Sequence, residues 1–492
     1  MNLPASFIER TRLLLGQTEA GQLFEALETE QPVSIRLNPL KIEKSFPQLS
    51  TFNSQLSTPP VPWCSNAYYL NHRPTFTFDP LFHAGAYYVQ EAGSMFVEQV
   101  LRQYVPQEPI TALDLCAAPG GKSTLLRSLL PEGSLLVANE VMRQRSQVLA
   151  ENLTKWGHPD VVVTNNDPAD FTSLGKLFDL ILTDVPCSGE GMFRKDETAV
   201  SEWSPENVEL CWQRQRRILT DIWPCLKPGG LLIYSTCTYN TQENEENVRW
   251  IRDALGAEIL PLDISPEWHI IGNLLPDETF PVYRFLPHKV QSEGFFLAVL
   301  RKAGGTEESM ADNVVSDIRK VGKNKRKEQV KGKNLSTLGK EQLHEAQSWL
   351  TTPDTYDLQV CGNLVSVLPR VYAPLIAYLQ SSLHVLQSGC SLAELKGRDL
   401  VPHHALAMNR LLKEDAFPRV KVEYGQAIAY LRRETITLDE APRGFVLLTY
   451  RQMPLGFVKN IGNRANNLYP PEWRIRSSYL PEEVRLALVA MP

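Results

Sequence analysis

Short apolar runs alternate with longer amphipathic stretches between residues 111 and 300. The runs predict strands at 111–115, 134–138, 161–164, 179–184, 231–236 and 294–300. The amphipathic stretches predict helices at 122–130, 148–156, 205–226 and 242–254. Strands and helices that alternate at these lengths are typical of βαβ units. We therefore predict an α/β fold built on a parallel sheet with helices on both faces.

The chain on either side of this repeat has a different pattern. Residues 4–29 predict one or two amphipathic helices, residues 33–37 a strand, and residues 47–62 a proline- and serine-rich loop. Aromatic residues crowd the segment 63–88, and we interpret them as core because RNA-stacking surfaces are a minority class. Beyond residue 346 the sequence is helical and then strand-rich, with strands expected at 422–438, 445–450 and 455–459.

Composition narrows the class of protein. With 43% hydrophobic and 22% charged residues the chain is ordinary globular material, and its formal charge of −6 argues against a wholly basic nucleic-acid coat. Eight cysteines without a C-x-x-C spacing match neither a disulfide framework nor a zinc site, so we expect a reduced, cytoplasmic protein without a metal. We recognise no signal peptide and no apolar run near the ~18 residues of a membrane span, so we expect no membrane association.

One segment carries a strong local charge. Eight lysines and arginines lie between residues 319 and 333, against one acid, Glu328. Two interpretations stay open, a solvated tether and an arm that contacts phosphates.

A loop of small residues follows the first strand of the repeat. It reads Asp114-Leu115-Cys116-Ala117-Ala118-Pro119-Gly120-Gly121-Lys122-Ser123-Thr124. A P-loop would need glycine at position 116, and Pro119 removes an N–H group from a cradle that works through N–H groups. The G-x-G-x-x-G pattern of dinucleotide sites is also missing. What remains is a turn at which a ligand approaches the backbone closely.

Acidic residues lie at the ends of the next two strands of the repeat. Glu140 ends the second strand, where an acid accepts hydrogen bonds from ribose hydroxyls, and Asp167 follows the third, within reach of an adenine. A ribose-binding acid without a phosphate loop indicates a nucleoside-type cofactor that lacks phosphates, namely S-adenosylmethionine.

Two cysteines each lie just past the end of a strand. Cys187 follows Asp184-Val185-Pro186, and Cys237 follows Ser235-Thr236. If the two strands are neighbours, both thiols open into one crevice. A thiolate that adds to C6 of a pyrimidine makes C5 a nucleophile toward a sulfonium methyl group, and a second group must then help to remove the C5 proton. Asp184 is suited to stabilise charge at N3 of the base. The residues alone do not rank the two thiols, and Cys211 and Cys225 are interpreted as core.

These segments resemble the Nop/Sun family of RNA (cytosine-5) methyltransferases. Residues 116–122, 184–195 and 235–238 carry the resemblance, which covers about residues 1–302, and the long form at 188–195 is most similar to the bacterial small-subunit rRNA branch. It implies a Rossmann-like methyltransferase sheet, Cys237 as nucleophile and Cys187 in product release. It also implies that S-adenosylmethionine is held by Cys116, Ala117, Ala118, Pro119, Gly120, Gly121, Lys122, Glu140, Asp167 and Asp184.

The tail is similar to the same branch at 395–398, 402–407, 454–457 and 467–470, which implies a PUA-like RNA-binding module. We therefore expect four parts. They are a small N-terminal α+β RNA-binding region at 1–75, the methyltransferase core at 76–302, the basic linker at 303–345, and a C-terminal α+β RNA-binding region at 346–492. The last divides into 346–425 and a PUA-like part at 426–492.

The leading hypothesis is a monomeric methyltransferase that acts on C5 of cytidine in 16S rRNA or the small ribosomal subunit. One alternative is a tRNA cytosine-5 methyltransferase, because the catalytic core is shared. The other is a non-catalytic RNA-binding ribosome assembly factor, and the intact thiols, Asp184 and cofactor loop speak against it.

Overall fold

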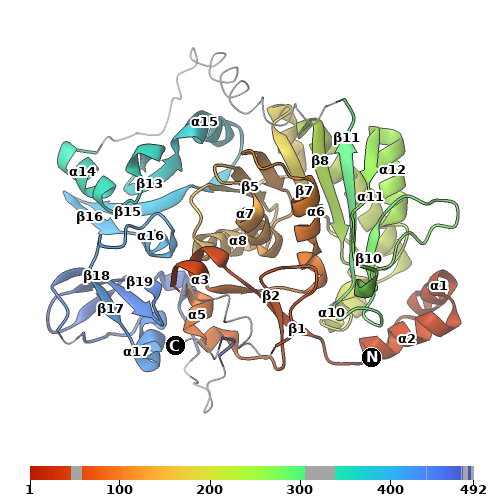
Figure 1. The fold of residues 1–492 in the computed structure, drawn as a ribbon, viewed down its shortest axis with the longest axis horizontal. Helices are drawn as coiled ribbons and strands as arrows, with labels where there is room; N and C mark the ends of the chain where they lie inside the picture. Colours follow the sequence, from red (N-terminus) through yellow and green to blue (C-terminus); the bar gives the residue numbers. More distant parts are fainter. Residues whose placement is uncertain (46–57, 305–337, 439, 478, 480–485, 489–492) are drawn as a thin grey trace.

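The computed structural model describes residues 1–45, 58–304, 338–438, 440–477, 479 and 486–488. A nine-stranded sheet lies at its centre, with the strand order β10-β11-β8-β7-β4-β5-β6-β14 and with β9 paired to β11 (Figure 1). The five strands from β8 to β6 in this order are parallel, which confirms the predicted parallel sheet. The strands are β4 (Thr111–Asp114), β5 (Leu135–Asn139), β6 (Val161–Thr164), β7 (Phe178–Asp184), β8 (Leu226–Thr236), β9 (Ala257–Leu260), β10 (Tyr283–Phe285), β11 (Phe295–Lys302) and β14 (Val385–Ser388).

Helices cover both faces of this sheet. Apolar side chains of α6 (Val97–Tyr104), α7 (Gly121–Leu129) and α8 (Arg143–Trp156) pack on one face. Those of α9 (Pro168–Phe171), α11 (Pro205–Ile222) and α12 (Glu245–Leu255) pack on the other. The helix expected at 205–226 ends at Ile222, and Lys227–Gly230 belong to β8 rather than to a helix stop. The short helix α10 (Glu197–Glu202) precedes α11.

The edge strand β14 comes from the C-terminal region and was not predicted. It pairs antiparallel with β6, and the helix before it, α15 (Ala373–Ser382), buries Leu375, Ile376 and Leu379 in the same core as α11. The C-terminal region is therefore built into the methyltransferase sheet.

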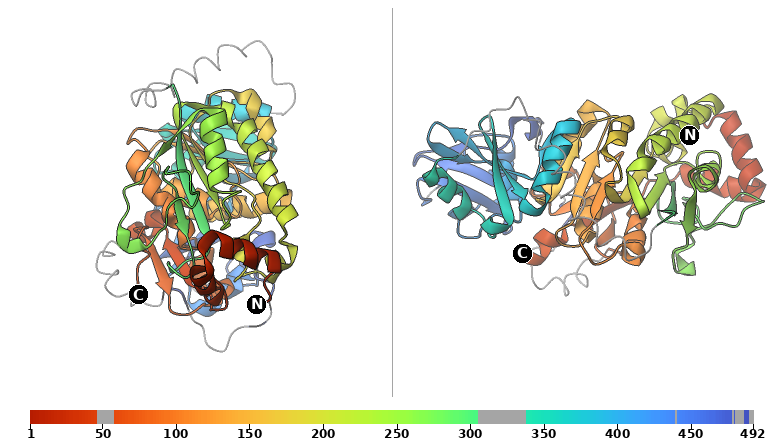
Figure 2. Two further views of the ribbon diagram at one scale, coloured as in Figure 1. Left: turned by 90° about the vertical axis from the view of Figure 1, so that its right-hand side faces the viewer. Right: turned by 90° about the horizontal axis from the view of Figure 1, so that it is seen from above.

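The N-terminal region contacts the central domain at two places: Arg36 donates to Gly121 and Thr124 of α7, and Phe7, Leu23 and Leu27 pack with Phe193, Trp203 and Val208 beside α10 and α11. It contains α1 (Ala5–Leu15), α2 (Gln17–Leu27), α3 (Pro39–Ser45), α5 (Pro80–His83) and a sheet of β1 (Val33–Leu37), β2 (Ala67–Leu70) and β3 (Tyr87–Val89). The aromatic segment is core, as predicted, since Trp63, Tyr69, Phe78 and Tyr87 are all at most 5% exposed. Figure 2 shows α1 and α2 at the opposite end of the molecule from the C-terminal modules.

The C-terminal region forms two four-stranded sheets (Figure 1). The first contains β12 (Tyr356–Cys361), β13 (Leu364–Pro369), β15 (Cys390–Lys396) and β16 (Asp399–Pro402), flanked by α14 (Lys340–Ser348) and α16 (His404–Met408). The second contains β17 (Arg419–Lys421), β18 (Gly444–Tyr450), β19 (Met453–Asn460) and β20 (Ala465–Asn467). The prediction of a strand at 422–438 is wrong. The helix α17 (Tyr424–Leu431) occupies the first half of this range, and Glu423 and Gln426 form a capping box at its N-terminus.

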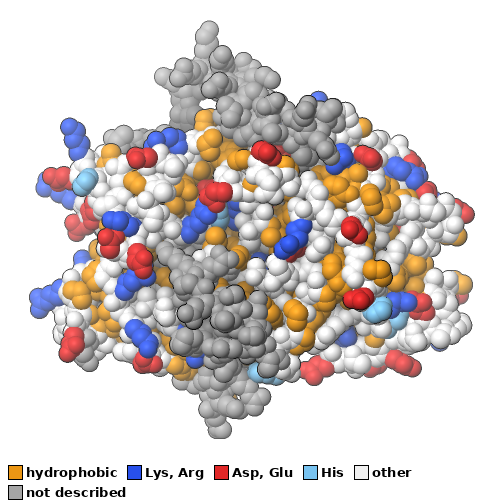
Figure 3. Space-filling view, viewed as in Figure 1, with side chains coloured by type: hydrophobic (Ala, Val, Ile, Leu, Met, Phe, Trp, Pro, Cys, Tyr) orange, Lys and Arg blue, Asp and Glu red, His pale blue; other side chains and the backbone are white. Residues whose placement is uncertain are grey.

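Surface charge does not mark the face seen in Figure 3 as an RNA surface. Basic and acidic side chains are interspersed over the part of the molecule visible in Figure 3. The basic segment at 319–333 and most of the loop at 47–62 lie outside the described residues. Within the described parts of the chain, no helix is long and apolar enough to cross a bilayer.

Candidate active site

The two strands that precede the key cysteines are direct neighbours. β7 and β8 pair in parallel, with Asp184 opposite Ser235, so both strands end at the same edge of the sheet. The Sγ atoms of Cys187 and Cys237 lie 3.1 Å apart, and the backbone N–H of Cys237 donates to Cys187 Sγ at 3.4 Å. The structure thus brings both thiols into one crevice.

Cys187 is perturbed by its neighbour. The hydrogen bond to Cys237, followed by burial, raises the pKa of Cys187 well above its ordinary value. A thiol that keeps its proton can donate a hydrogen bond to a thiolate beside it, so the pair can hold one thiol and one thiolate.

Asp184 lies at the end of β7 and is oriented from two sides. Lys122 Nζ is 2.8 Å from one carboxylate oxygen, and Ser235 Oγ donates to the other at 2.8 Å. Burial would lower the pKa of Lys122, but the charges of Asp184, Asp114 and Cys237 outweigh it and raise the pKa. Lys122 is therefore a permanent cation between the cofactor loop and the thiols.

The loop between β4 and α7 is held by hydrogen bonds to its carbonyl groups. Arg145 donates to the Ala118 carbonyl at 2.7 Å, and Asn152 donates to the Pro119 carbonyl at 2.8 Å. The Ala118–Pro119 peptide bond is cis, and Gly120 has φ +115°, a conformation that residues with a side chain rarely adopt. The loop consequently turns sharply into α7 and leaves backbone open to a ligand.

Acidic groups surround this loop. Burial raises the pKa of Asp114 to about 7, and its Oδ1 has no hydrogen-bond partner although its Oδ2 accepts from Ser123 at 2.6 Å. Burial and these nearby acids also raise the pKa of Cys116. Glu140 is 2% exposed at the end of β5 and accepts from the Met142 backbone N–H at 2.9 Å.

The residues around the loop fit S-adenosylmethionine. An unpaired buried carboxylate oxygen on Asp114 and the Glu140 carboxylate offer acceptors to hydroxyl donors and to positive charge. Asp167 is less available: both its carboxylate oxygens accept from Arg217 on α11, at 2.9 and 3.1 Å.

Sequence reasoning missed a polar layer beneath the thiols. Ser188, Glu190, Asn240 and Glu243 are all at most 8% exposed and are joined by hydrogen bonds. The available signal was the run of acids and asparagines from 240 to 247, which is unusually polar for a segment that follows a buried strand.

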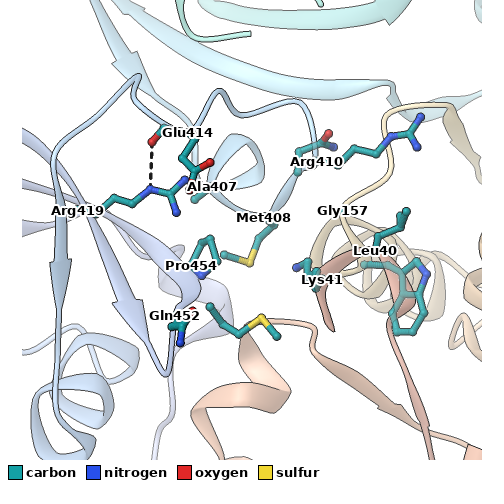
Figure 4. Close-up of a pocket in the computed structure, with 13 residues that line it drawn as sticks. Leu40, Lys41, Gly157, Ala407, Met408, Arg410, Glu414, Arg419, Gln452 and Pro454 are labelled. Atoms are coloured by element: carbon teal, nitrogen blue, oxygen red, sulfur yellow. Dashed lines mark hydrogen bonds between the residues drawn. The ribbon is translucent and has the colours of Figure 1, made fainter. Parts of the chain in front are cut away.

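A separate cavity of about 140 Å³ lies away from the predicted site residues (Figure 4). The N-terminal region contributes Leu40 and Lys41, α8 ends there at Trp156 and Gly157, and Met408 and Pro454 come from the C-terminal region. This cavity marks the junction of the three parts of the chain.

Comparisons with known proteins cover every part of the chain described above. Residues 102–301 match the family described as 16S rRNA methyltransferase RsmB/F. Residues 3–92 match the N-terminal domain of 16S rRNA methyltransferase RsmF, and residues 417–475 match the methyltransferase RsmF PUA domain. The "Ribosomal RNA small subunit methyltransferase F" of Cronobacter sakazakii is 30% identical over 489 residues, 96% of either chain. The chain belongs to the RsmB/F family, in its RsmF type.

Further similarities agree with this family. The methyltransferase of the same name from Escherichia coli O17:K52:H18 is 30% identical and aligns with 95% of this RsmB/F chain and 96% of its own. A solved methyltransferase homologue from Pyrococcus horikoshii is 30% identical with a TM-score of 0.52, over 60% of this chain and 94% of that one. NSun6 from the same organism, solved with SFG, shares the fold at 22% identity and a TM-score of 0.51, over 61% and 99%.

Proposed function

We propose that this RsmB/F-family protein transfers a methyl group from S-adenosylmethionine to C5 of a cytidine in 16S rRNA, through a covalent bond between Cys237 and C6 of the base. The observation that carries the proposal is the 3.1 Å contact between two thiols at the ends of adjacent parallel strands. Methylation at C5 needs one thiol to add to the ring and benefits from a second group when the product is released.

Cys237 adds to C6 as the thiolate. The Cys187 thiol stabilises this thiolate across the 3.1 Å contact, and the Lys122 ammonium adds positive charge nearby. The target base must leave its stack to reach the crevice, as for other enzymes that act on a nucleobase. When bound, S-adenosylmethionine supplies an electrophilic methyl group, and the enamine formed by addition of Cys237 directs C5 toward it.

Asp184 acts at the opposite edge of the base. Addition at C6 places negative charge on N3, which a hydrogen bond from a carboxylic acid stabilises. The proton on Asp184 comes from solvent, and Lys122, in contact with Asp184 at 2.8 Å, remains an ammonium ion beside it. Ser235 keeps the carboxyl group facing the crevice.

Release requires removal of the C5 proton. Cys187 loses its own proton to solvent once Cys237 has become a thioether, because the hydrogen bond that most strongly raised the pKa of Cys187 is then gone. The Cys187 thiolate accepts the proton from C5, the C6–Sγ bond breaks, and Cys237 leaves as a thiolate. One proton reaches solvent in each turnover, which balances the methyl cation gained by the base.

The flanking regions would hold the RNA around the target base. We assign this role to residues 1–75, the linker at 303–345 and residues 346–492, with a monomer acting on 16S rRNA, free or in the small ribosomal subunit, in the cytoplasm. The matches to an RsmF-type N-terminal domain and PUA domain favour rRNA over tRNA as the substrate class.

Trapping of the covalent adduct tests the proposal. Cys187→Ala is expected to accumulate a protein–RNA adduct that survives denaturing electrophoresis with 16S rRNA and labelled S-adenosylmethionine. Cys237→Ala is expected to form none and to transfer no methyl group. An adduct trapped by Cys237→Ala instead would reverse the two roles, and absence of methyl transfer by the unaltered protein would rule out the enzyme. Bisulfite mapping of the labelled rRNA then identifies the cytidine.

A further inference from the structure

Two buried carboxylates connect the segments that carry the thiols. Glu190 follows Cys187 by three residues and Glu243 follows Cys237 by six, and they are 2% and 0% exposed. The structure places neither carboxylate in hydrogen-bond contact with a described Sγ atom, yet both lie directly beneath the crevice. We call Glu190, Asn240 and Glu243 the carboxylate clasp.

The hydrogen bonds of the carboxylate clasp cross between the two segments. Glu243, from the Cys237 segment, accepts from the backbone N–H of Ser188 at 3.0 Å and from the Ser188 hydroxyl, so it holds the turn that carries Cys187. Glu190, from the Cys187 segment, accepts from the backbone N–H groups of Tyr239 and Asn240 at 2.7 and 2.9 Å, so it holds the turn that carries Cys237. Each carboxylate therefore fixes the other segment's thiol.

A single amide joins the two halves. Asn240 Nδ2 lies 2.8 Å from Glu243 and 3.1 Å from Glu190. Gln215 on α11 donates to Glu243 at 2.8 Å, and the Trp203 indole donates to Glu190 at 3.0 Å. Glu243 thus has four donors around two oxygens, which fixes its position and, through Ser188, that of the Cys187 turn.

The charge of Glu243 also acts on the Cys187 thiol. Burial, with Glu190 as the next cause, raises the pKa of Glu243 to about 7. The Glu243 charge in turn contributes to the raised pKa of Cys187 and remains there after Cys237 has bonded to the base. During release, the environment of Cys187 is therefore set by burial and by Glu243.

We propose that Glu243 is the positioning residue of the release step: acting through Ser188, it fixes Cys187 opposite the C5 proton while Cys237 is bonded to C6. This inference rests on the roles given to the two thiols above. Glu190, by the same geometry, positions Cys237 for addition. The two carboxylates, although equally buried, are thus expected to affect different halves of the reaction.

Glu243→Gln and Glu190→Gln form the matched pair that tests this. An amide in place of Glu243 sets an NH2 group against the donors of Ser188 or Gln215, which moves the Cys187 turn. For Glu243→Gln we expect steady-state turnover to fall about 100-fold, the effect of a small misplacement, while the single-turnover rate of methyl transfer changes little and the RNA adduct accumulates. For Glu190→Gln we expect slower methyl transfer without accumulation of adduct.

Three measurements separate positioning from a general loss of structure. The melting temperature and the dissociation constant for S-adenosylmethionine report folding, and both should stay near those of the unaltered protein. In a Cys187→Ala background, Glu243→Gln should slow release no further, because it acts through Cys187. If Glu243→Gln does not fold, Ser188→Ala replaces it and should accumulate adduct with a smaller loss, about 10-fold, because the backbone contact remains.

The outcomes are distinct. If Cys187→Ala traps no adduct, the roles of the thiols fail and this inference fails with them. If Cys187→Ala traps the adduct but Glu243→Gln does not, only the inference is overturned. Equal effects of Glu190→Gln and Glu243→Gln on adduct and on single-turnover rate also overturn it, since a crossed clasp predicts opposite effects.

Discussion

The thiol crevice and the three-way junction at the end of α8 both bring together segments far apart in the chain, but by different means. In the crevice, hydrogen bonds to the Glu190 and Glu243 carboxylates connect two turns and set their spacing, beside one backbone hydrogen bond from Gly191 to Cys237 at 2.9 Å. At the junction, backbone meets backbone. A β-carbon on Gly157 would lie 2.1 Å from the Met408 carbonyl oxygen, and one on Gly85 would lie 2.1 Å from that of Lys155.

The two kinds of contact have different roles. One fixes the positions of reacting atoms, and the other attaches parts of the chain to each other. Hydrogen bonds to buried carboxylates fix two atoms relative to each other, which is what a reaction between Sγ, C6 and C5 requires. Close backbone contacts join the regions instead, as where Arg410 N–H donates to the Gly157 carbonyl at 3.0 Å, and they tolerate no side chain. Substitutions in the crevice should therefore lower the rate of methyl transfer, and substitutions at the junction should lower the free energy of unfolding.

Among the substitutions that compare the two regions, Gly191→Ala is expected to give the largest effect on activity. A β-carbon there would lie 2.7 Å from the Gly294 carbonyl oxygen and 2.9 Å from that of Cys237, so the Cys237 turn must shift. We expect methyl transfer to fall about 100-fold, the cost of a displacement near 1 Å, in single-turnover assays with labelled S-adenosylmethionine. A melting temperature that falls while the rate per folded molecule is unchanged would contradict the view of the crevice as the site of precision.

Gly157→Ala is the matching change at the junction. The new side chain meets the Met408 carbonyl oxygen, and Gly157 has φ +85°, so we expect a loss of about 3 kcal/mol in the free energy of unfolding by urea. The control is Gly256→Ala, a helix C-cap with the same left-handed backbone (φ +69°) but nothing within 4 Å, and it should cost about 1 kcal/mol. If the two variants lose equal stability, the backbone contact contributes nothing.

The sequence predicted the position of the two thiols better than it predicted the contacts that join distant segments of the chain. Cys187 and Cys237 could be placed together because each follows an apolar run, and strands of a βαβ repeat end at one edge. The crossing of Glu190 and Glu243 was out of reach, since only the tertiary fold shows that each carboxylate faces the other segment. β14 gave little signal because all four of its residues are only partly buried and it joins the sheet through backbone hydrogen bonds. The error at α17 was avoidable, because Glu423 and Gln426 have the spacing of a capping box.

Arg36→Met tests a contact that belongs to both regions. Arg36 on β1 is 1% exposed, donates to Gln90 at 2.9 Å and to the Gly121 carbonyl at 3.2 Å, and stacks on Trp156. Loss of the guanidinium leaves buried acceptors unpaired, so we expect about 2 kcal/mol less stability against urea and weaker binding of S-adenosylmethionine in calorimetry. Arg370→Met, which removes an exposed ion pair with Asp357, should cost at most about 1 kcal/mol.

The last comparison is a difference in pH dependence between the two regions. Burial raises the pKa of Asp114, at the crevice, from 3.8 to about 7, and burial lowers the pKa of Lys41, at the junction, from 10.5 to about 7. Between pH 4 and 7 the folded protein binds more protons at Asp114 than the unfolded chain does, so this group's contribution to stability is lost as pH rises. Between pH 7 and 10 the unfolded chain binds more protons at Lys41, so that contribution grows as pH rises.

Asp114→Asn should therefore weaken the pH dependence of the free energy of unfolding below pH 7. Lys41→Met should weaken it above pH 7. Urea unfolding at pH 5, 7 and 9 measures this: the difference between Asp114→Asn and the unaltered protein should change mostly between pH 5 and 7 and little above. For Lys41→Met the difference should change mostly between pH 7 and 9. Because groups remote from the substituted residue titrate equally in protein and variant, each difference reports that residue together with its charged neighbours. A Lys41→Met difference that changes as much between pH 5 and 7 as between pH 7 and 9 would show that the junction titrates together with the crevice, and the two regions would then be one electrostatic unit.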